Sequence, residues 1–170
     1  DQKLAYDLLI LAAGSTVNYF GIKGAEEHSL PVRTINDGRA IRDRIFDAFE
    51  TPARNRTFTI VGGGPTGVEL ALETYELCHA LAKKRHLQFK VAIIDGNMRV
   101  LGSLDQAFSK EAENALRRHG VELVLGRRVQ EVTKDTLMLD QGEIITSHVF
   151  WAAGMKASPL PLAPAPEKDR

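Results

Sequence analysis

The chain has 170 residues, 44% of them hydrophobic, which is the length and composition of one ordinary domain with its own core. Its 22 basic and 22 acidic side chains cancel, so no net field favours nucleic acid or an anionic membrane as a partner. No membrane span, signal peptide, metal-ligand spacing, nucleophile elbow or Walker lysine occurs in the sequence, so we expect no metal, no hydrolase chemistry and a protein of cytoplasmic character.

An almost continuous apolar run opens the chain at residues 6–12 and stops at Gly14. Such a run predicts a buried strand that ends in a glycine turn. The glycines and proline of residues 20–31 indicate an irregular connection. A helix is predicted next, capped by Asn36 or Asp37, because apolar residues then recur at helical spacing.

The most informative stretch follows a β-branched and aromatic run at residues 58–61. Gly62, Gly64 and Gly67 fill the fingerprint G-x-G-x-x-G, in which the first glycine permits a tight turn, the second lets the backbone approach a pyrophosphate, and the third packs helix against strand. The N-terminus of the following helix can hold the anion without a lysine. A plain glycine turn is the alternative, and the flanking strand and helix patterns favour the nucleotide. Cys78, the single cysteine, lies on the apolar face of that helix and is expected to fill the core rather than serve redox chemistry.

A second apolar run, residues 89–94, ends in Asp95. This fold places an acidic residue there, about 20 residues after the last glycine, to bind the adenosine ribose; the longer spacing here implies a longer first helix or loop. A strand-end carboxylate can take both ribose hydroxyls while its charge repels a 2′-phosphate, so NADH is expected to bind better than NADPH. A surface turn is the alternative for Asp95. Arg99 is the alternative partner for a 2′-phosphate, although its position also suits lining the loop or the pyrophosphate.

The rest of the chain completes an α/β fold. Asp105 is predicted to cap a helix that Gly120 terminates, and a third parallel strand follows at residues 121–125. The period then changes, which indicates a β-meander followed by a last apolar strand; the predicted strands are residues 129–132, 136–139, 144–146 and 148–152. We therefore predict a Rossmann-like parallel sheet flanked by helices, with a three-stranded β-meander.

A sequence motif that occurs twice indicates how the chain is organised. The segments Leu-Ile-Leu-Ala-Ala-Gly and Val-Phe-Trp-Ala-Ala-Gly end at Gly14 and Gly154. Both have the pattern of the last strand of such a domain. The second closes the domain that the glycine fingerprint opens, whereas the first has no opening of its own before it. We expect residues 1–20 to be a remnant closing strand and linker of an absent domain, 21–154 the nucleotide domain, and 155–170 a proline-rich tail, extended or disordered, that leads back to the absent domain.

These motifs resemble the flavoproteins with two dinucleotide-binding domains, and most closely the type II NADH dehydrogenases (NADH:quinone oxidoreductases). The matching segments are residues 9–15 with Asn18-Tyr19-Phe20-Gly21, and residues 60–71, 120–122 and 149–160. The resemblance implies an NADH-binding domain inserted in a flavin domain, with hydride passing from NADH to FAD and electrons onward to a quinone at a membrane surface. The absent domain is then the flavin domain, and this chain alone is expected neither to hold FAD stably nor to turn over. The alternatives are the NAD(P)H domain of a related ferredoxin reductase or other flavoprotein reductase, and a free-standing NAD(H)-sensing module.

The resemblance also implies site residues. As cofactor-binding residues it indicates Gly62, Gly63, Gly64, Pro65, Thr66, Gly67, Asp95, Val129, Ala153 and Gly154. Glu69 resembles the family glutamate that lies near the nicotinamide and the flavin edge, where a carboxylate orients the ring or passes a proton. The alternative is a capping box from Thr66 to Glu69, although Pro65 prefers the first helical position and would make Gly64 the cap.

An unpartnered apolar strand has a consequence for assembly. The strand at residues 8–11 would expose its faces and its edge without the flavin domain. We expect it to pair with a second copy of the chain, as a homodimer, or to lie across the edge of its own sheet. In the full-length protein, the same resemblance implies a location at the inner face of a membrane, bound peripherally.

Overall fold

The computed structural model describes residues 5–51, 55–146 and 148–159. In chain order its elements are β1 (Ser15–Val17), α1 (Ala25–His28), β2 (Ser29–Pro31), α2 (Ile35–Glu50), β3 (Thr57–Val61), α3 (Pro65–Arg85), β4 (Lys90–Asp95), α4 (Gln106–Arg118), β5 (Glu122–Leu125), β6 (Val129–Val132), β7 (Thr136–Leu139), β8 (Glu143–Ile145), β9 (His148–Trp151) and β10 (Met155–Ala157). The predicted α/β fold is confirmed, with a parallel sheet and a separate antiparallel meander.

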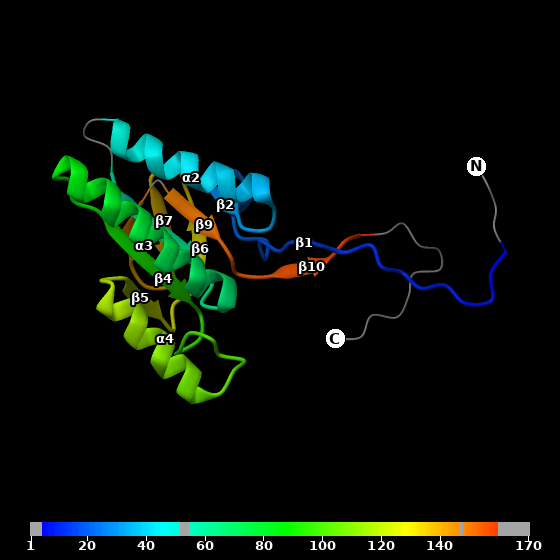
Figure 1. Cartoon of the computed structure of the whole chain (residues 1–170). Helices are drawn as coiled ribbons and strands as arrows, with labels where there is room; N and C mark the ends of the chain where they lie inside the picture. The colour runs from blue at the N-terminus through cyan, green and yellow to red at the C-terminus, as the bar shows by residue number, and fades with distance from the viewer. Residues whose placement is uncertain (1–4, 52–54, 147, 160–170) are drawn as a thin grey trace.

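Three layers make up the body of the protein. A five-stranded parallel sheet, in the order β2-β9-β3-β4-β5, is covered on one face by α2, α3 and α4, which lie side by side in Figure 1. The antiparallel sheet β6-β7-β8 packs on the other face through buried residues such as Val132 and Leu137. Side chains therefore alternate along each central strand: Ile60 of β3 enters the core under the helices, while Val61 enters the core under the meander.

The order of the strands fixes where a site can form. The chain runs from β3 outward through α3 and β4 to α4 and β5, and then returns with β9 on the opposite side of β3. The strand order therefore reverses between β3 and β9, where Val61 is level with Trp151. In open parallel sheets, ligands bind outside the carboxyl ends of the strands at such a reversal.

The helix ends agree with the sequence in one case and correct it in another. Asp105 caps α4 as predicted, with Oδ1 accepting a hydrogen bond from the Ala107 N–H at 2.8 Å. Thr34, rather than Asn36 or Asp37, caps α2. The Thr34 hydroxyl accepts from the Asp37 N–H at 3.2 Å, and the Asp37 carboxylate accepts from the Thr34 N–H at 2.7 Å, which is a reciprocal capping box.

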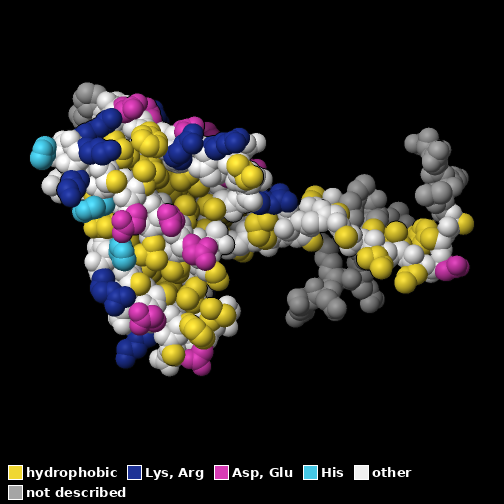
Figure 2. Space-filling model, viewed as in Figure 1, with side chains coloured by type: hydrophobic (Ala, Val, Ile, Leu, Met, Phe, Trp, Pro, Cys, Tyr) yellow, Lys and Arg dark blue, Asp and Glu magenta, His cyan; other side chains and the backbone are white. Residues whose placement is uncertain are grey.

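The prediction of a strand at residues 6–12 is wrong for this structure. Residues 6–12 form no strand, and Leu8 and Ile10 are 81% and 82% exposed. An apolar run becomes a strand only where it pairs with another strand, and residues 6–12 pair with neither edge strand of the sheet, β2 or β5. The segment does not lie across its own sheet edge, and Figure 2 shows its hydrophobic side chains on an arm that projects from the body.

Pairing instead begins at β1, which is antiparallel to β10, so that Val17 is level with Met155. The predicted tail therefore opens with a strand, and the part of it beyond residue 159 lies outside the described residues. Within the irregular connection that we expected at residues 20–31, α1 and β2 form, and β2 extends the parallel sheet beside β9. No helix in the described ranges is long and apolar enough to cross a membrane.

Candidate functional site

The glycine turn between β3 and α3 has the geometry that the motif predicts. Gly62 has φ +113°, and a Cβ there would lie 2.6 Å from the carbonyl of Ala152, in the loop after β9. A Cβ on Gly67 would lie 1.8 Å from the Gly62 oxygen, so only glycine lets α3 approach the turn this closely. By contrast, a Cβ on Gly64 would meet nothing within 4 Å. The turn thus packs tightly at its first and third glycines and is open at the second.

The start of α3 decides between the two interpretations of Glu69. Gly64 is the N-cap and Pro65 the first helical residue, so the capping box from Thr66 to Glu69 does not form. Within the described part of the chain, no side chain caps this helix end, which leaves its first N–H groups available to an anion. Glu69 is exposed and has no hydrogen bond from its side chain to another described residue.

Asp95 ties the end of β4 to the glycine turn. Its Oδ2 accepts from the Gly63 N–H at 2.6 Å, and its Oδ1 accepts from the backbone N–H of Asn97 at 2.7 Å and from the Asn97 amide at 2.8 Å. A carboxylate offers about four acceptor positions, so about one remains. In this geometry Asp95 can accept one ribose hydroxyl, not the two that the sequence led us to expect. A Cβ on Gly63 would lie 3.0 Å from Oδ2, so a side chain at position 63 would push the Asp95 carboxylate by a few tenths of an ångström.

A pocket of about 490 Å³ opens beside these groups, at the carboxyl ends of β3, β4 and β9. Its lining comprises Phe20, Ile22, Val61, Gly62, Ile94, Asp95, Gly96, Asn97, Arg127, Arg128, Val129, Trp151 and Ala153. Of the predicted binding residues, Gly62, Asp95, Val129 and Ala153 therefore come together in one cavity. The remaining ones adjoin this wall without lining it: Gly63, Gly64, Pro65, Thr66 and Gly67 follow Gly62 in the chain, and Gly154 follows Ala153.

Sequence reasoning missed one wall of the pocket, which is built around Asn18. Trp151 Nε1 donates to the Asn18 carbonyl at 2.9 Å, and the Asn18 N–H donates to the Gly154 carbonyl at 3.1 Å. The Asn18 side chain accepts from the Phe20 N–H at 2.9 Å and so supports the left-handed φ of +52° at Phe20. The word Asn-Tyr-Phe-Gly was visible in the sequence, but nothing local connects it to a tryptophan far along the chain.

Three arginines stand near the site, and two are engaged. Arg99 donates to the carbonyls of Leu104 and Gly102 at 3.0 and 2.8 Å, so it holds the loop before α4. This is the loop-lining role that we considered beside the binding of a 2′-phosphate. Arg127 donates to the Gln141 side chain at 2.7 Å and pairs with Asp140 at 3.5 Å. Arg128 is exposed and has no ion pair or side-chain hydrogen bond within the described residues.

Cys78 belongs to the core, as expected. It is fully buried under the helices, and burial raises the pKa of its thiol to about 12. A thiol with so high a pKa carries almost no thiolate at neutral pH and is chemically inert. Elsewhere, burial and the charge of Glu26 raise the pKa of Tyr19, which packs 5.6 Å from Trp151 between ring centroids.

A parallel sheet with a glycine turn at its strand-order reversal, an acid at the end of the next strand and a pocket between them define a Rossmann-like domain. The chain belongs to the pyridine nucleotide-disulphide oxidoreductase family, which it matches over residues 1–168. It is 31% identical to a probable NADH dehydrogenase of Dictyostelium discoideum, over 98% of this chain and 41% of that protein. It is 33% identical to the type II NADH:quinone oxidoreductase Ndh of Mycobacterium tuberculosis, over 91% of this chain and 38% of that one.

The fold has the same relatives. The structure of NDH2 from Plasmodium falciparum in complex with NADH superposes with a TM-score of 0.82 and 24% identity, covering 91% of this chain and 36% of that chain. The expected resemblance to the type II NADH dehydrogenases is thus confirmed. The chain spans about two fifths of the length of the curated relatives named here.

Proposed function

We propose that this chain is the NADH-binding domain of a flavin-dependent NADH dehydrogenase. The observation that carries the proposal is the glycine turn, which is open at Gly64 and faces the uncapped start of α3 beside the pocket of Asp95. An open backbone and free N–H groups suit a pyrophosphate, and the neighbouring carboxylate suits a ribose hydroxyl. In the whole protein, hydride passes from NADH to FAD and electrons pass on to a quinone.

Each end of the dinucleotide then has a part of the site. In the turn Gly62-Gly63-Gly64-Pro65-Thr66-Gly67, the N–H groups of Gly62 and Gly63 already donate to Ile94 and Asp95, and Pro65 has no N–H. The N–H groups of Gly64, Thr66 and Gly67 therefore hold the pyrophosphate, and Asp95 accepts a ribose hydroxyl. Val129 forms apolar surface on the adenine side, while Ala153 and Gly154 border the nicotinamide side. The loop after β9 contacts Gly62 closely, so both sides of the pocket are fixed to the same turn.

Glu69 is the residue that we assign to chemistry. It lies in the second turn of α3, is exposed, and is not spent on capping the helix. Glu69 does not line the pocket, and we assign its carboxylate to orienting the nicotinamide or moving a proton when the whole protein is assembled. FAD, when bound by the complete protein, supplies the two-electron acceptor for the hydride.

The ribbon of β1 and β10 supports the division of the chain. It brings residues 15–17 and 155–157 together, so the segments that enter and leave residues 21–154 run side by side, as an inserted domain requires. We propose that residues 1–20 and 155–170 connect this domain to the flavin domain of the whole protein. The exposed apolar residues 8–11 would pack there, or against a second copy of the chain in a homodimer. Quinone and the inner face of the membrane, where the whole protein binds peripherally, are then reached only through the full-length protein, which would be cytoplasmic.

Calorimetry with NADH on the 170-residue chain tests the binding proposal. We expect saturable binding with one site per chain, and loss of that binding in the Gly64→Ala variant. A correctly folded chain that binds no NADH up to millimolar concentration would contradict the proposal. Assay of the full-length protein with NADH and a soluble quinone then tests the activity, with Glu69→Gln expected to lower kcat more than it raises KM.

A further inference from the structure

The pocket holds a basic group that the proposed function does not use. Gly126, Arg127 and Arg128 form the loop between β5 and β6, and two backbone hydrogen bonds fix this loop against the end of β4. The Arg127 N–H donates to the Asp95 carbonyl at 3.1 Å, and the Gly126 N–H donates to the Asn97 carbonyl at 2.8 Å. The Arg128 carbonyl accepts from the Asp140 N–H at 2.9 Å, so the backbone is fixed by hydrogen bonds at both Arg127 and Arg128.

The side chain of Arg128 lies over the residue that follows Asp95. A Cβ on Gly96 would be 3.4 Å from Arg128 Cγ and 3.8 Å from Arg128 Nε. A Cβ at position 96 would thus be in ordinary van der Waals contact with the Arg128 side chain, and both Arg128 and Asp95 line the same pocket. The Arg128 side chain therefore passes next to Gly96, the residue that follows Asp95, whose carboxylate faces the adenosine ribose in the proposed binding mode.

The other charged side chains near Arg128 already have hydrogen-bond partners in the protein. Arg127 is held by Gln141 and Asp140, and Arg99 is held by loop carbonyls outside the pocket. The Asp95 carboxylate accepts three N–H groups, which spread part of its charge. Among the described residues that line the pocket, Arg128 is thus the cationic side chain that has no protein partner. It lies near the proposed position of the ribose.

From this geometry we propose that Arg128 is a specificity-determining residue that binds a 2′-phosphate on the adenosine ribose, so that the domain accepts NADPH as well as NADH. The proposal rests on the proposed function, because it deepens the nucleotide choice of the same site. A guanidinium offers planar, paired donors that match phosphate oxygens. It offsets the repulsion between Asp95 and the 2′-phosphate, which by itself would exclude NADPH.

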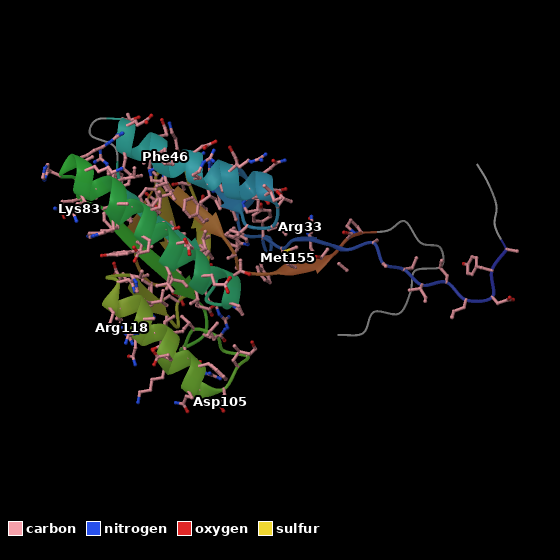
Figure 3. All side chains as sticks on the ribbon, viewed as in Figure 1. Arg33, Phe46, Lys83, Asp105, Arg118 and Met155 are labelled. Atoms are coloured by element: carbon pink, nitrogen blue, oxygen red, sulfur yellow. The ribbon has the colours of Figure 1, made fainter. Side chains whose placement is uncertain are left out.

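Four proteins test this assignment by calorimetry: the unchanged chain, Arg128→Gln, Arg128→Lys and, as a matched control, Lys83→Gln. The control removes one positive charge at the far end of α3 from the glycine turn, where Figure 3 shows Lys83. Each protein is titrated with ADP-ribose and with its 2′-phosphate, which need no flavin, and then with NADH and NADPH. Thermal unfolding checks that every variant is folded.

We expect the unchanged chain to bind the 2′-phosphorylated ligands within about fivefold of the others, since charge-assisted hydrogen bonds from the guanidinium to the phosphate offset much of the repulsion. Arg128→Gln should weaken the phosphorylated ligands about tenfold and the others less than twofold, with partial recovery in Arg128→Lys and no change in Lys83→Gln. Added salt should weaken the phosphorylated ligands more than the others.

Three results would overturn the assignment. Equal weakening of all ligands by Arg128→Gln would mean that the arginine stacks on the adenine or supports the loop. No weakening of any ligand would mean that it faces solvent only. Failure of the unchanged, folded chain to bind any of the four ligands would refute the proposed function itself. This outcome differs from failure of the Arg128 assignment alone, because NADH and ADP-ribose would then still bind.

Discussion

Two alanine substitutions in the glycine turn separate packing from ligand binding. In Gly67→Ala, the new Cβ would lie 1.8 Å from the Gly62 oxygen. Carbon and oxygen atoms at rest stay more than about 3 Å apart, so α3 must retreat from the turn by roughly 1 Å. Because the obstacle is backbone and the neighbouring Ile60 is fully buried, the helix cannot relax at low cost. Overpacking of this kind costs about 3 kcal/mol.

In Gly64→Ala, the new Cβ meets nothing within 4 Å and φ is −73°, a value that alanine adopts freely. Alanine is a somewhat poorer N-cap than glycine, but it also reduces the entropy of the unfolded chain, and each effect is worth about 0.5 kcal/mol with opposite sign. The stability should therefore hardly change. The methyl group would nevertheless occupy the space above the turn, where the pyrophosphate is proposed to lie.

Thermal unfolding and calorimetry with NADH measure both effects. For a chain of this length we expect Gly67→Ala to lower Tm by about 6–12 °C, and Gly64→Ala to leave Tm within about 2 °C. The second variant should lose at least about tenfold in NADH affinity, or about 1.4 kcal/mol. Full NADH affinity in Gly64→Ala would show that no pyrophosphate approaches that residue, and an unchanged Tm in Gly67→Ala would refute the close packing of helix and turn.

Further predictions follow from individual side chains. Asp95→Asn places an NH₂ group against the N–H donors of Gly63 or Asn97, so we expect it to lose about 1–3 kcal/mol of stability in denaturant unfolding, whereas Asp105→Asn keeps a good helix cap and should lose almost none. Burial raises the pKa of Cys78 to about 12, so a thiol reagent at pH 8 should modify it only when the protein unfolds, and rapid labelling of the folded chain would contradict its core position. Trp151 is the single tryptophan and lines the pocket, so NADH should quench its fluorescence, while Trp151→Phe should remove the signal and leave calorimetric binding in place. Mixed with NADH, FAD and a soluble quinone, the chain alone should oxidise NADH no faster than protein-free controls, because it does not align the nicotinamide with a flavin; oxidation at enzymatic rates would show a complete active site.

The parts of the fold that sequence predicted are those that depend on local pattern. The turn after β3, the helix that follows it and the three strands of the meander each leave a periodic or glycine signal within a few residues. Asp95 was proposed because it ends the first apolar strand after that signal, although its distance from the glycines is longer than usual. The cap of α2 was placed two residues late because Asn36 and Thr34 are both good caps, and only the extended backbone of Thr34 distinguishes them.

The parts that sequence missed depend on residues far apart in the chain. Residues 29–31 become the edge strand β2 only because β9 lies beside them, more than a hundred residues later. Arg128 belongs to the site only because its loop is hydrogen-bonded to the end of β4. The apolar run at residues 6–12 was misjudged for the converse reason: burial is a property of a strand and its neighbours together, and hydrophobicity alone does not supply the neighbours.

The position of Asn18 connects the organisation of the chain to its site. Asn18 directly follows β1, and its backbone bonds both Trp151 and Gly154, the residues on either side of the loop that closes on Gly62. The ribbon of β1 and β10 therefore cannot shift without moving the nicotinamide side of the proposed site. Under the proposal that residues 21–154 are inserted in a flavin domain, NADH would pass its hydride toward that domain, and β1 and β10 are the strands that lead to it. The hydrogen bonds of Asn18 that anchor the ribbon would then also fix the position of the nicotinamide relative to the flavin of the whole protein.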